Sequence, residues 1–202
     1  MEYTQISIMD MIEGVGEDRC KNILSSFSCP LNHDVEDFIR NKAIDFAKQK
    51  IAITFLVFAR EKEKRELVGY FALANKFVAV EENKLSNTLK KRVLKFSQYD
   101  KDMDRYLLSM PLIAQLGKNF ADALELSISG NDLLHMACKK VMEAQDIIGG
   151  KTVYIECADN PKLHEFYSRY GFFEFGKRIK DAGELLEEKY LVQMLLYFKK
   201  TI

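Results

Sequence analysis

Two side chains in the second half of the chain, Tyr167 and Glu156, could move protons in a reaction. A tyrosine phenol can donate a proton as a general acid, and a glutamate carboxylate can take one as a general base. Each residue also has a structural explanation, because Tyr167 lies at helical spacing from other aromatic residues and a strand glutamate is as often a surface residue. Cys157 has no histidine near it in sequence, which favours a small buried residue over a nucleophile.

The segment around Tyr167, NPKLHEFYSRYGF, carries the signals of a complete short helix. Asn160 can cap it, because its side-chain oxygen can accept from the free N–H groups of the first turn. Pro161 fits the first helical position, and Gly171 is the left-handed residue that commonly ends a helix. The apolar face comprises Leu163, Phe166, Tyr167 and Tyr170. The sequence therefore predicts a helix over 161–170 and then a strand from Phe172.

Composition favours one globular domain, because 48% of the 202 residues are hydrophobic, enough for a substantial core. Thirty lysines and arginines balance thirty acids, which argues weakly against dedicated nucleic-acid binding. The amino terminus lacks a signal pattern, and the longest apolar-rich run, 51–59, is too short to span a bilayer. We expect a soluble, cytoplasmic protein that makes no membrane contact.

The cysteines and histidines show no metal-ligand spacing and no C-x-x-C pair. We therefore expect reduced thiols and no metal site. The histidines lie away from the apolar faces of their expected helices or near a helix cap, so none is assigned a catalytic role. The residues concerned are Cys20, Cys29, Cys138, Cys157, His33, His135 and His164.

The hydrophobic pattern predicts an order of strands and helices. Pro111 is placed at the start of its strand or at a bulge, because proline removes a ladder hydrogen bond. Antiparallel strands come first and strand–helix–strand–helix–strand follows, so the fold class is α/β, with a mixed sheet covered by helices. Strands are expected at 3–8, 51–59, 67–80, 107–118, 152–158, from 172 and at 191–198, and helices at 17–27, 32–46, 84–96, 131–148 and 161–170.

The helix at 160–172 resembles the last sequence motif of the GNAT acyl-CoA N-acyltransferases, N-x-x-x-x-x-F-Y-x-x-x-G-F. The matching residues are Asn160, Phe166, Tyr167, Gly171 and Phe172. The resemblance implies a single GNAT-like N-acetyltransferase domain over 1–202, with a mostly antiparallel sheet whose middle strands splay apart. It also implies acetyl-CoA as the cofactor, with Asn160 and Phe166 beside the coenzyme A thiol and Tyr167 as the acid that protonates the departing thiolate.

The same resemblance places the coenzyme pyrophosphate at the start of the helix at 131–148. Free N–H groups and the helix dipole favour an anion there, although an ordinary helix cap would look the same in sequence. The family's loop reads Q/R-x-x-G-x-G/A, and only its last glycine is present, as Gly130; Glu125 occupies the Q/R position and Ile128 the first glycine position. The expected coenzyme contacts are Ser129, Gly130, Asn131 and Asp132 for the pyrophosphate, and the backbone of Leu116, Gly117 and Lys118 for the pantetheine arm.

Acyl transfer from a thioester to an amine needs an oxyanion stabiliser, a neutral amine and a proton for the leaving thiolate. A backbone N–H near Leu116 could polarise the thioester carbonyl. Tyr167 could supply the proton, since its ordinary pKa of about 10 is close to that of a thiol. Glu156 could deprotonate the ammonium directly or through water. The expected function is an acetyl-CoA-dependent N-acetyltransferase acting on an unidentified primary amine in a ternary complex; the altered glycine loop leaves a noncatalytic acyl-CoA-binding module as an alternative.

The amino-terminal half resembles a narrower GNAT branch, the toxin acetyltransferases that modify aminoacyl-tRNA. The similar elements are Phe27, Cys29 and Leu31-Asn32 before a helix, and GYFAL at 69–73. A tRNA acceptor is one alternative. We prefer a peptide or metabolite acceptor, because the basic residues that could bind tRNA phosphates lie on a helix face, and such a face is usually only solvated. A homodimer is one option for assembly, and the chain alone indicates no antitoxin. The basic patch comprises Lys84, Lys90, Lys91, Arg92 and Lys95.

Overall fold

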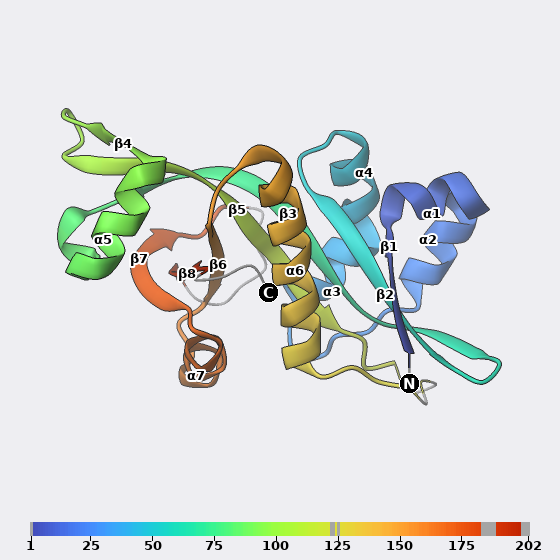
Figure 1. Ribbon diagram of the computed structural model, residues 1–202. Helices are drawn as coiled ribbons and strands as arrows, with labels where there is room; N and C mark the ends of the chain where they lie inside the picture. The colour runs from blue at the N-terminus through green and yellow to red at the C-terminus, as the bar shows by residue number, and fades with distance from the viewer. Residues whose placement is uncertain (1, 122–123, 125, 183–188, 199–202) are drawn as a thin grey trace. The chain divides into compact units, whose positions relative to one another are not determined.

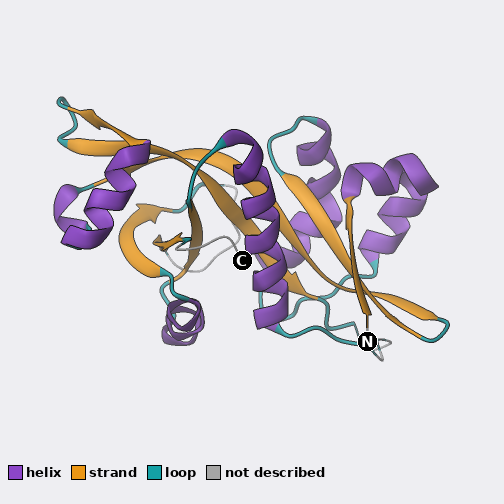
Figure 2. Ribbon diagram, in the orientation of Figure 1, coloured by secondary structure: helices purple, strands orange, loops and turns teal. Residues whose placement is uncertain are grey.

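The computed structural model describes residues 2–121, 124, 126–182 and 189–198 (Figures 1 and 2). The chain divides into two compact units, the first made of residues 1–74 and 114–138 and the second of residues 75–113 and 139–202. Strands β3 (Lys64–Val80) and β5 (Arg105–Lys118) and helix α6 (Gly130–Ile148) contribute residues to both units. The single domain expected over 1–202 stays a prediction.

The described strands form an eight-stranded sheet in the order β1-β2-β3-β5-β6-β8-β7, with β4 paired to β5. The pairs β1–β2, β2–β3, β4–β5, β6–β8 and β7–β8 are antiparallel, and β5–β6 is parallel. The predicted mixed, mostly antiparallel sheet is therefore confirmed, whereas the splaying of its middle strands stays a prediction. The remaining strands are β1 (Glu2–Ser7), β2 (Ile53–Glu61), β4 (Ser97–Asp100), β6 (Thr152–Ala158), β7 (Phe173–Ile179) and β8 (Tyr190–Tyr197).

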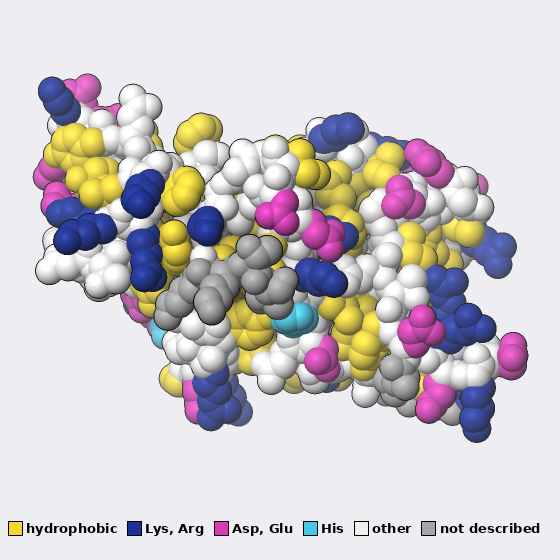
Figure 3. All heavy atoms as spheres, viewed as in Figure 1, with side chains coloured by type: hydrophobic (Ala, Val, Ile, Leu, Met, Phe, Trp, Pro, Cys, Tyr) yellow, Lys and Arg dark blue, Asp and Glu magenta, His cyan; other side chains and the backbone are white. Residues whose placement is uncertain are grey.

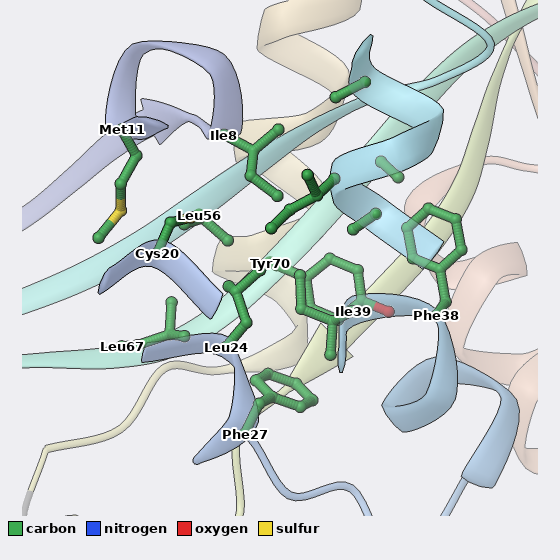
Figure 4. Close-up of a cluster of buried hydrophobic side chains, with 14 of the residues drawn as sticks. Ile8, Met11, Cys20, Leu24, Phe27, Phe38, Ile39, Leu56, Leu67 and Tyr70 are labelled. Carbon is green, nitrogen blue, oxygen red and sulfur yellow. The ribbon is translucent and has the colours of Figure 1, made fainter. Parts of the chain in front are cut away.

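Helices of the first unit lie beside β1 and β2, as Figure 1 shows. Their apolar side chains and those of β2 and β3 form one buried cluster, in which the Tyr70 ring lies between those of Phe27 and Phe38 (Figure 4). The rings of Phe27 and Tyr70 meet edge-on with centroids 5.2 Å apart, and Phe38 stacks on Tyr70 at 6.2 Å. The helices are α1 (Ile8–Val15), α2 (Glu17–Ser25), α3 (His33–Asp37), a π-helical turn at Phe38–Lys42, and α4 (Ala43–Lys48).

Tyr70 joins this core to α3 through its hydroxyl group. The hydroxyl is fully buried and donates to the Val35 carbonyl at 2.6 Å. Burial raises the pKa of Tyr70 well above its ordinary value, so the group stays protonated and remains a donor. A buried polar group needs such a partner, because an unsatisfied one costs free energy.

We expect Tyr70→Phe to lower the free energy of unfolding by about 1–3 kcal/mol, because the Val35 carbonyl loses its buried donor while the ring remains. Urea unfolding of the purified chain measures this change. Tyr190→Phe, at a tyrosine that is 44% exposed, is the matched control and should leave stability unchanged. Equal stability of the two variants would contradict the assigned role.

One helix of the second unit is shorter than the sequence predicts. The helix expected over 84–96 is instead α5 (Asn87–Val93) between two 3-10 turns, because Ser86 caps it through a hydrogen bond from the Leu89 N–H. Phe96, which follows α5, is 40% exposed. At the end of α6, Ile148 is 74% exposed, whereas Gln145 is buried and donates to the Thr152 carbonyl at 2.6 Å.

Pro111 lies inside β5, so its expected place at the start of the strand is wrong, and the alternative of a bulge stays a prediction. Residues Arg105–Leu108 of β5 pair with β4, and Leu112 and Ile113 pair with β6. Pro111 therefore sits between two partner strands, where a missing backbone N–H interrupts neither of these ladders.

Candidate active site

Helix α7 (Pro161–Tyr170) forms as its sequence signals predict. The Asn160 side chain accepts from the Lys162 N–H at 2.9 Å, and Pro161 occupies the first helical position. Gly171 ends the helix in the left-handed conformation with φ 102°, and the Phe172 N–H donates to the Tyr167 carbonyl at 3.1 Å. These contacts fix both ends of the helix that carries Tyr167, and α7 leads directly into β7.

Tyr167 is packed among aromatic rings. Its ring centroid lies 5.0 Å from that of Phe166 and 5.7 Å from that of Phe172, both edge-on. The side chain is only 8% exposed. Tyr167 is therefore buried among aromatic rings, as its helical spacing predicts, and its role as an acid stays a prediction.

Glu156 lies on β6 in a polar network within the second unit. Its Oε2 accepts from Arg178 Nε at 2.7 Å and its Oε1 accepts from Gln193 Nε2 at 2.9 Å. Only 12% of the glutamate side chain is exposed. Each carboxylate oxygen has two lone pairs, so Arg178 and Gln193 fix the orientation of Glu156 while each oxygen keeps a second acceptor site.

Gly117 brings the end of β5 close to α3 in the first unit. A Cβ atom added at Gly117 would lie 2.4 Å from Val35 Cγ1 and 2.9 Å from Tyr70 Cε1, distances that packed atoms do not adopt. Gly69 on β3 shows the same closeness, since its Cβ would lie 2.9 Å from the Gly117 carbonyl oxygen. The two glycines thus allow β3, β5 and α3 to approach closely.

Lys118, the last residue of β5, directs its ammonium group over the ring of Phe120, 5.4 Å from the centroid. Asn119, which follows, is a buried residue that the sequence analysis missed. Its Oδ1 accepts from the Ser28 N–H at 2.9 Å and its Nδ2 donates to the Leu67 carbonyl at 2.8 Å. Asparagine is a common turn residue, and nothing else in the sequence marks this position.

The first turn of α6 is capped by its own side chains. The Ser129 hydroxyl accepts from the Asp132 N–H at 3.0 Å and donates to the Asp132 carboxylate at 2.6 Å. The alternative of an ordinary helix cap is therefore seen, and a bound pyrophosphate would lie near the Asp132 carboxylate. Glu125, which stands where the family loop has glutamine or arginine, lies outside the described residues.

The predicted site residues fall into two groups, one in each compact unit. The second unit positions Glu156, Asn160, Phe166 and Tyr167 on β6 and α7. The first unit positions Leu116, Gly117, Lys118, Ser129, Gly130, Asn131 and Asp132 at the end of β5 and the start of α6.

A further pair near β5 was also missed. Gln115 Nε2 donates to Asp34 Oδ2 at 3.0 Å, although the two residues are 81 positions apart. A contact between such distant positions leaves no spacing signal, and only the neighbouring Asn32 cap of α3 was visible in the sequence.

All four cysteines are free thiols and buried, as expected. Burial, with smaller effects from Asp159 and Glu174, raises the pKa of Cys157 to about 12. A thiol with so high a pKa carries little thiolate near neutral pH, so the structure favours the buried-residue interpretation over a nucleophile. None of the helices in the described ranges is both long and apolar enough to cross a membrane.

No protein-family model matches the sequence, and no curated protein matches it. Solved structures do match. AtaT complexed with acetyl-methionyl-tRNAfMet is 18% identical over 97% of this chain and 95% of that chain, with a TM-score of 0.64. A KacT mutant with tyrosine changed to phenylalanine is 16% identical over 96% of this chain and 95% of that chain, with a TM-score of 0.62.

AtaTR bound with AcCoA is 16% identical over 98% of this chain and 94% of that chain, with a TM-score of 0.58. Identities this low establish the fold alone. The chain therefore has the fold of these structures, and the GNAT-type architecture predicted from the sequence is confirmed.

Proposed function

We propose that this protein is an acetyl-CoA-dependent N-acetyltransferase that acts on a primary amine. The observation that carries the proposal is helix α7, where the Asn160 cap, the Gly171 stop and the packed Tyr167 reproduce the local geometry expected of the GNAT motif. The fold shared with AtaTR bound with AcCoA supports acetyl-CoA as the acyl donor.

Coenzyme A would be held by the first unit. The backbone of Leu116–Lys118 would pair with the pantetheine arm, on a strand that Gly117 holds against α3. First-turn amides of a helix have no partners within the helix, so the N–H groups of Gly130 and Asn131 would bind the pyrophosphate. The side chains of Ser129 and Asp132 cap the helix and fit this role less well.

Chemistry would proceed by direct attack. The neutral amine nitrogen forms a bond to the thioester carbonyl carbon, while the Leu116 N–H stabilises the charge that develops on oxygen. The C–S bond then breaks, Tyr167 donates its proton to the departing thiolate, and a proton from the attacking nitrogen leaves to solvent. The products are an N-acetyl amine and coenzyme A.

Incubation of the purified chain with radiolabelled acetyl-CoA and an amine panel tests the proposal. The panel contains methioninamide, spermidine, lysine-containing peptides and methionine-charged tRNA. We expect one labelled amide for each coenzyme A thiol released above the rate of hydrolysis. Tight acetyl-CoA binding without transfer to any amine would favour the noncatalytic binding module instead.

Glu156 stays a candidate base, and its contacts lead to a distinct expectation. Arg178 and Gln193 each donate to one carboxylate oxygen, so Glu156→Gln should lower the free energy of unfolding by about 1–3 kcal/mol. The same variant should change kcat less than about tenfold, which corresponds to less than about 1.4 kcal/mol in the activation free energy. Asp159→Asn, at an exposed carboxylate paired with Lys177, is the control. A loss of more than about a hundredfold in kcat with unchanged stability would make Glu156 the base.

Toxin-type acetylation of aminoacyl-tRNA is the second candidate. Figure 3 shows lysine and arginine side chains gathered over α5, where Lys90, Lys91 and Arg92 occupy the last turn. The shared fold with AtaT complexed with acetyl-methionyl-tRNAfMet also favours this acceptor. Induced expression in a bacterial host should then stop translation and leave acetylated aminoacyl-tRNA, and harmless expression of the active enzyme would argue against it.

A further inference from the structure

The segment that leads into α6 is held by side chains from two strands of the first unit. The Leu126 N–H donates to Glu66 Oε2 of β3 at 2.8 Å. At the next residue, the Ser127 carbonyl accepts from the Tyr3 hydroxyl of β1 at 2.9 Å. These contacts span 60 and 124 positions of the sequence. They lie just before Gly130, whose N–H we assign to the pyrophosphate.

Packing holds the same segment from below. Leu126 and Ile128 are buried while Ser127 between them is exposed, so alternate side chains of the segment are packed away from solvent. A Cβ atom added at Gly69 of β3 would lie 3.4 Å from Ile128 Cγ2. Gly69 therefore leaves room for this isoleucine, which stands where the family loop has its first glycine.

Hydrogen bonding within α6 starts at Ser129, directly after the anchored segment. The Ser129 carbonyl accepts from the Leu133 N–H at 3.1 Å, and Leu133 is itself buried. The N–H groups of Gly130 and Asn131 lie between this bond and the anchored segment, so the short stretch that carries them is fixed at both ends. Planar peptide bonds then restrict the directions in which these N–H groups can point, and an anion site needs donors that are oriented before the anion binds.

We infer that Glu66 is a positioning residue for the amides that bind the pyrophosphate, with Tyr3 as a second anchor. This inference rests on the proposed function. Neither side chain contacts the coenzyme in this account, because each acts through the backbone of Leu126 or Ser127. Burial, with a smaller effect from the Asp132 carboxylate, raises the pKa of Tyr3, so its hydroxyl remains a donor near neutral pH. Anchors that are in place beforehand reduce the entropy lost when the coenzyme binds.

Two acyl donors test the inference without knowledge of the acceptor amine. Acetyl-CoA carries the pyrophosphate, whereas S-acetyl-pantetheine has the same thioester and pantetheine arm without it. Calorimetry of the full chain gives the Kd of acetyl-CoA, and a displacement titration gives that of S-acetyl-pantetheine. Glu66→Ala should weaken acetyl-CoA binding roughly fivefold to tenfold, the effect of one lost hydrogen bond, and change S-acetyl-pantetheine binding less than about twofold. A general loss of structure would weaken both ligands.

Three further variants complete the experiment. Glu66→Gln should bind acetyl-CoA about as tightly as the wild type, because its amide oxygen can still accept from the Leu126 N–H. Tyr3→Phe should show the same selective loss as Glu66→Ala, since the Ser127 carbonyl loses its donor. Glu63→Ala removes an exposed carboxylate from the turn between β2 and β3, and this control should leave both affinities unchanged. Thermal unfolding verifies that each variant is folded.

The outcomes separate the two claims. An equal loss of affinity for both donors in Glu66→Ala, or unchanged acetyl-CoA affinity in the folded Glu66→Ala and Tyr3→Phe variants, overturns the inference and leaves the coenzyme site standing. Equal affinity of the wild type for the two donors would show that the pyrophosphate is not recognised, and it would overturn the inference as well. If the wild type binds neither donor, the proposed function fails and the inference fails with it.

Discussion

Tyr167→Phe is expected to lower kcat for acetyl transfer by roughly a hundredfold to ten-thousandfold, the usual contribution of a positioned general acid. The thiolate would then leave without a proton donor. Phenylalanine keeps the edge-on contacts with Phe166 and Phe172, so the fold and acetyl-CoA affinity should not change. Steady-state kinetics with saturating acceptor, together with calorimetry, measures the two effects separately.

Tyr170→Phe is the matched control, because Tyr170 lies on the same helix and its ring also meets that of Phe172, at 6.3 Å. We expect that variant to retain most activity. An undiminished kcat in Tyr167→Phe would reject the acid role while leaving the fold and the coenzyme site intact.

Gly117→Ala is expected to lower the free energy of unfolding by about 1–3 kcal/mol, as overpacking usually does. The new methyl group would lie 2.4 Å from Val35 Cγ1 and 2.9 Å from Tyr70 Cε1. The Tyr70 ring is fully buried and cannot move aside, so β5 must shift. Because the proposed pantetheine contacts are on this strand, acetyl-CoA affinity should fall as well.

Gly14→Ala provides the contrast, because no atom lies within 4 Å of its added Cβ and the residue is inside α1. That variant should be as stable as the wild type or more stable, by up to about 1 kcal/mol. Adding Val35→Ala to Gly117→Ala should recover part of the lost stability. A Gly117→Ala protein with unchanged unfolding and coenzyme affinity would show that the close approach is not required.

Local signals predicted the local structure well. Asn160, Pro161 and Gly171 act within a few residues of one another, and α7 has the bounds that they indicate. The same reasoning missed α1, whose start depends on the Ser7 hydroxyl accepting from the Asp10 N–H. It also made the helix around α5 too long, because hydrophobic spacing continued past the point where α5 ends at Val93.

Tertiary contacts set the parts of the candidate site that the sequence could not predict. The Asp34–Gln115 hydrogen bond and the Asn119 contacts join segments that are 52 to 91 residues apart. The Glu156 network joins three strands, β6, β7 and β8, and it fixes the orientation of the candidate base through one hydrogen bond to each carboxylate oxygen. Gly117 was selected as a coenzyme contact, and the structure adds a packing reason for glycine there.

Calorimetric titration of the full chain with acetyl-CoA tests the central claim most directly. The account predicts saturable binding at one site per chain, with a Kd between about 1 µM and 1 mM, the usual range for enzyme substrates. Absence of saturable heat at millimolar acetyl-CoA, with folded protein in the cell, would contradict it.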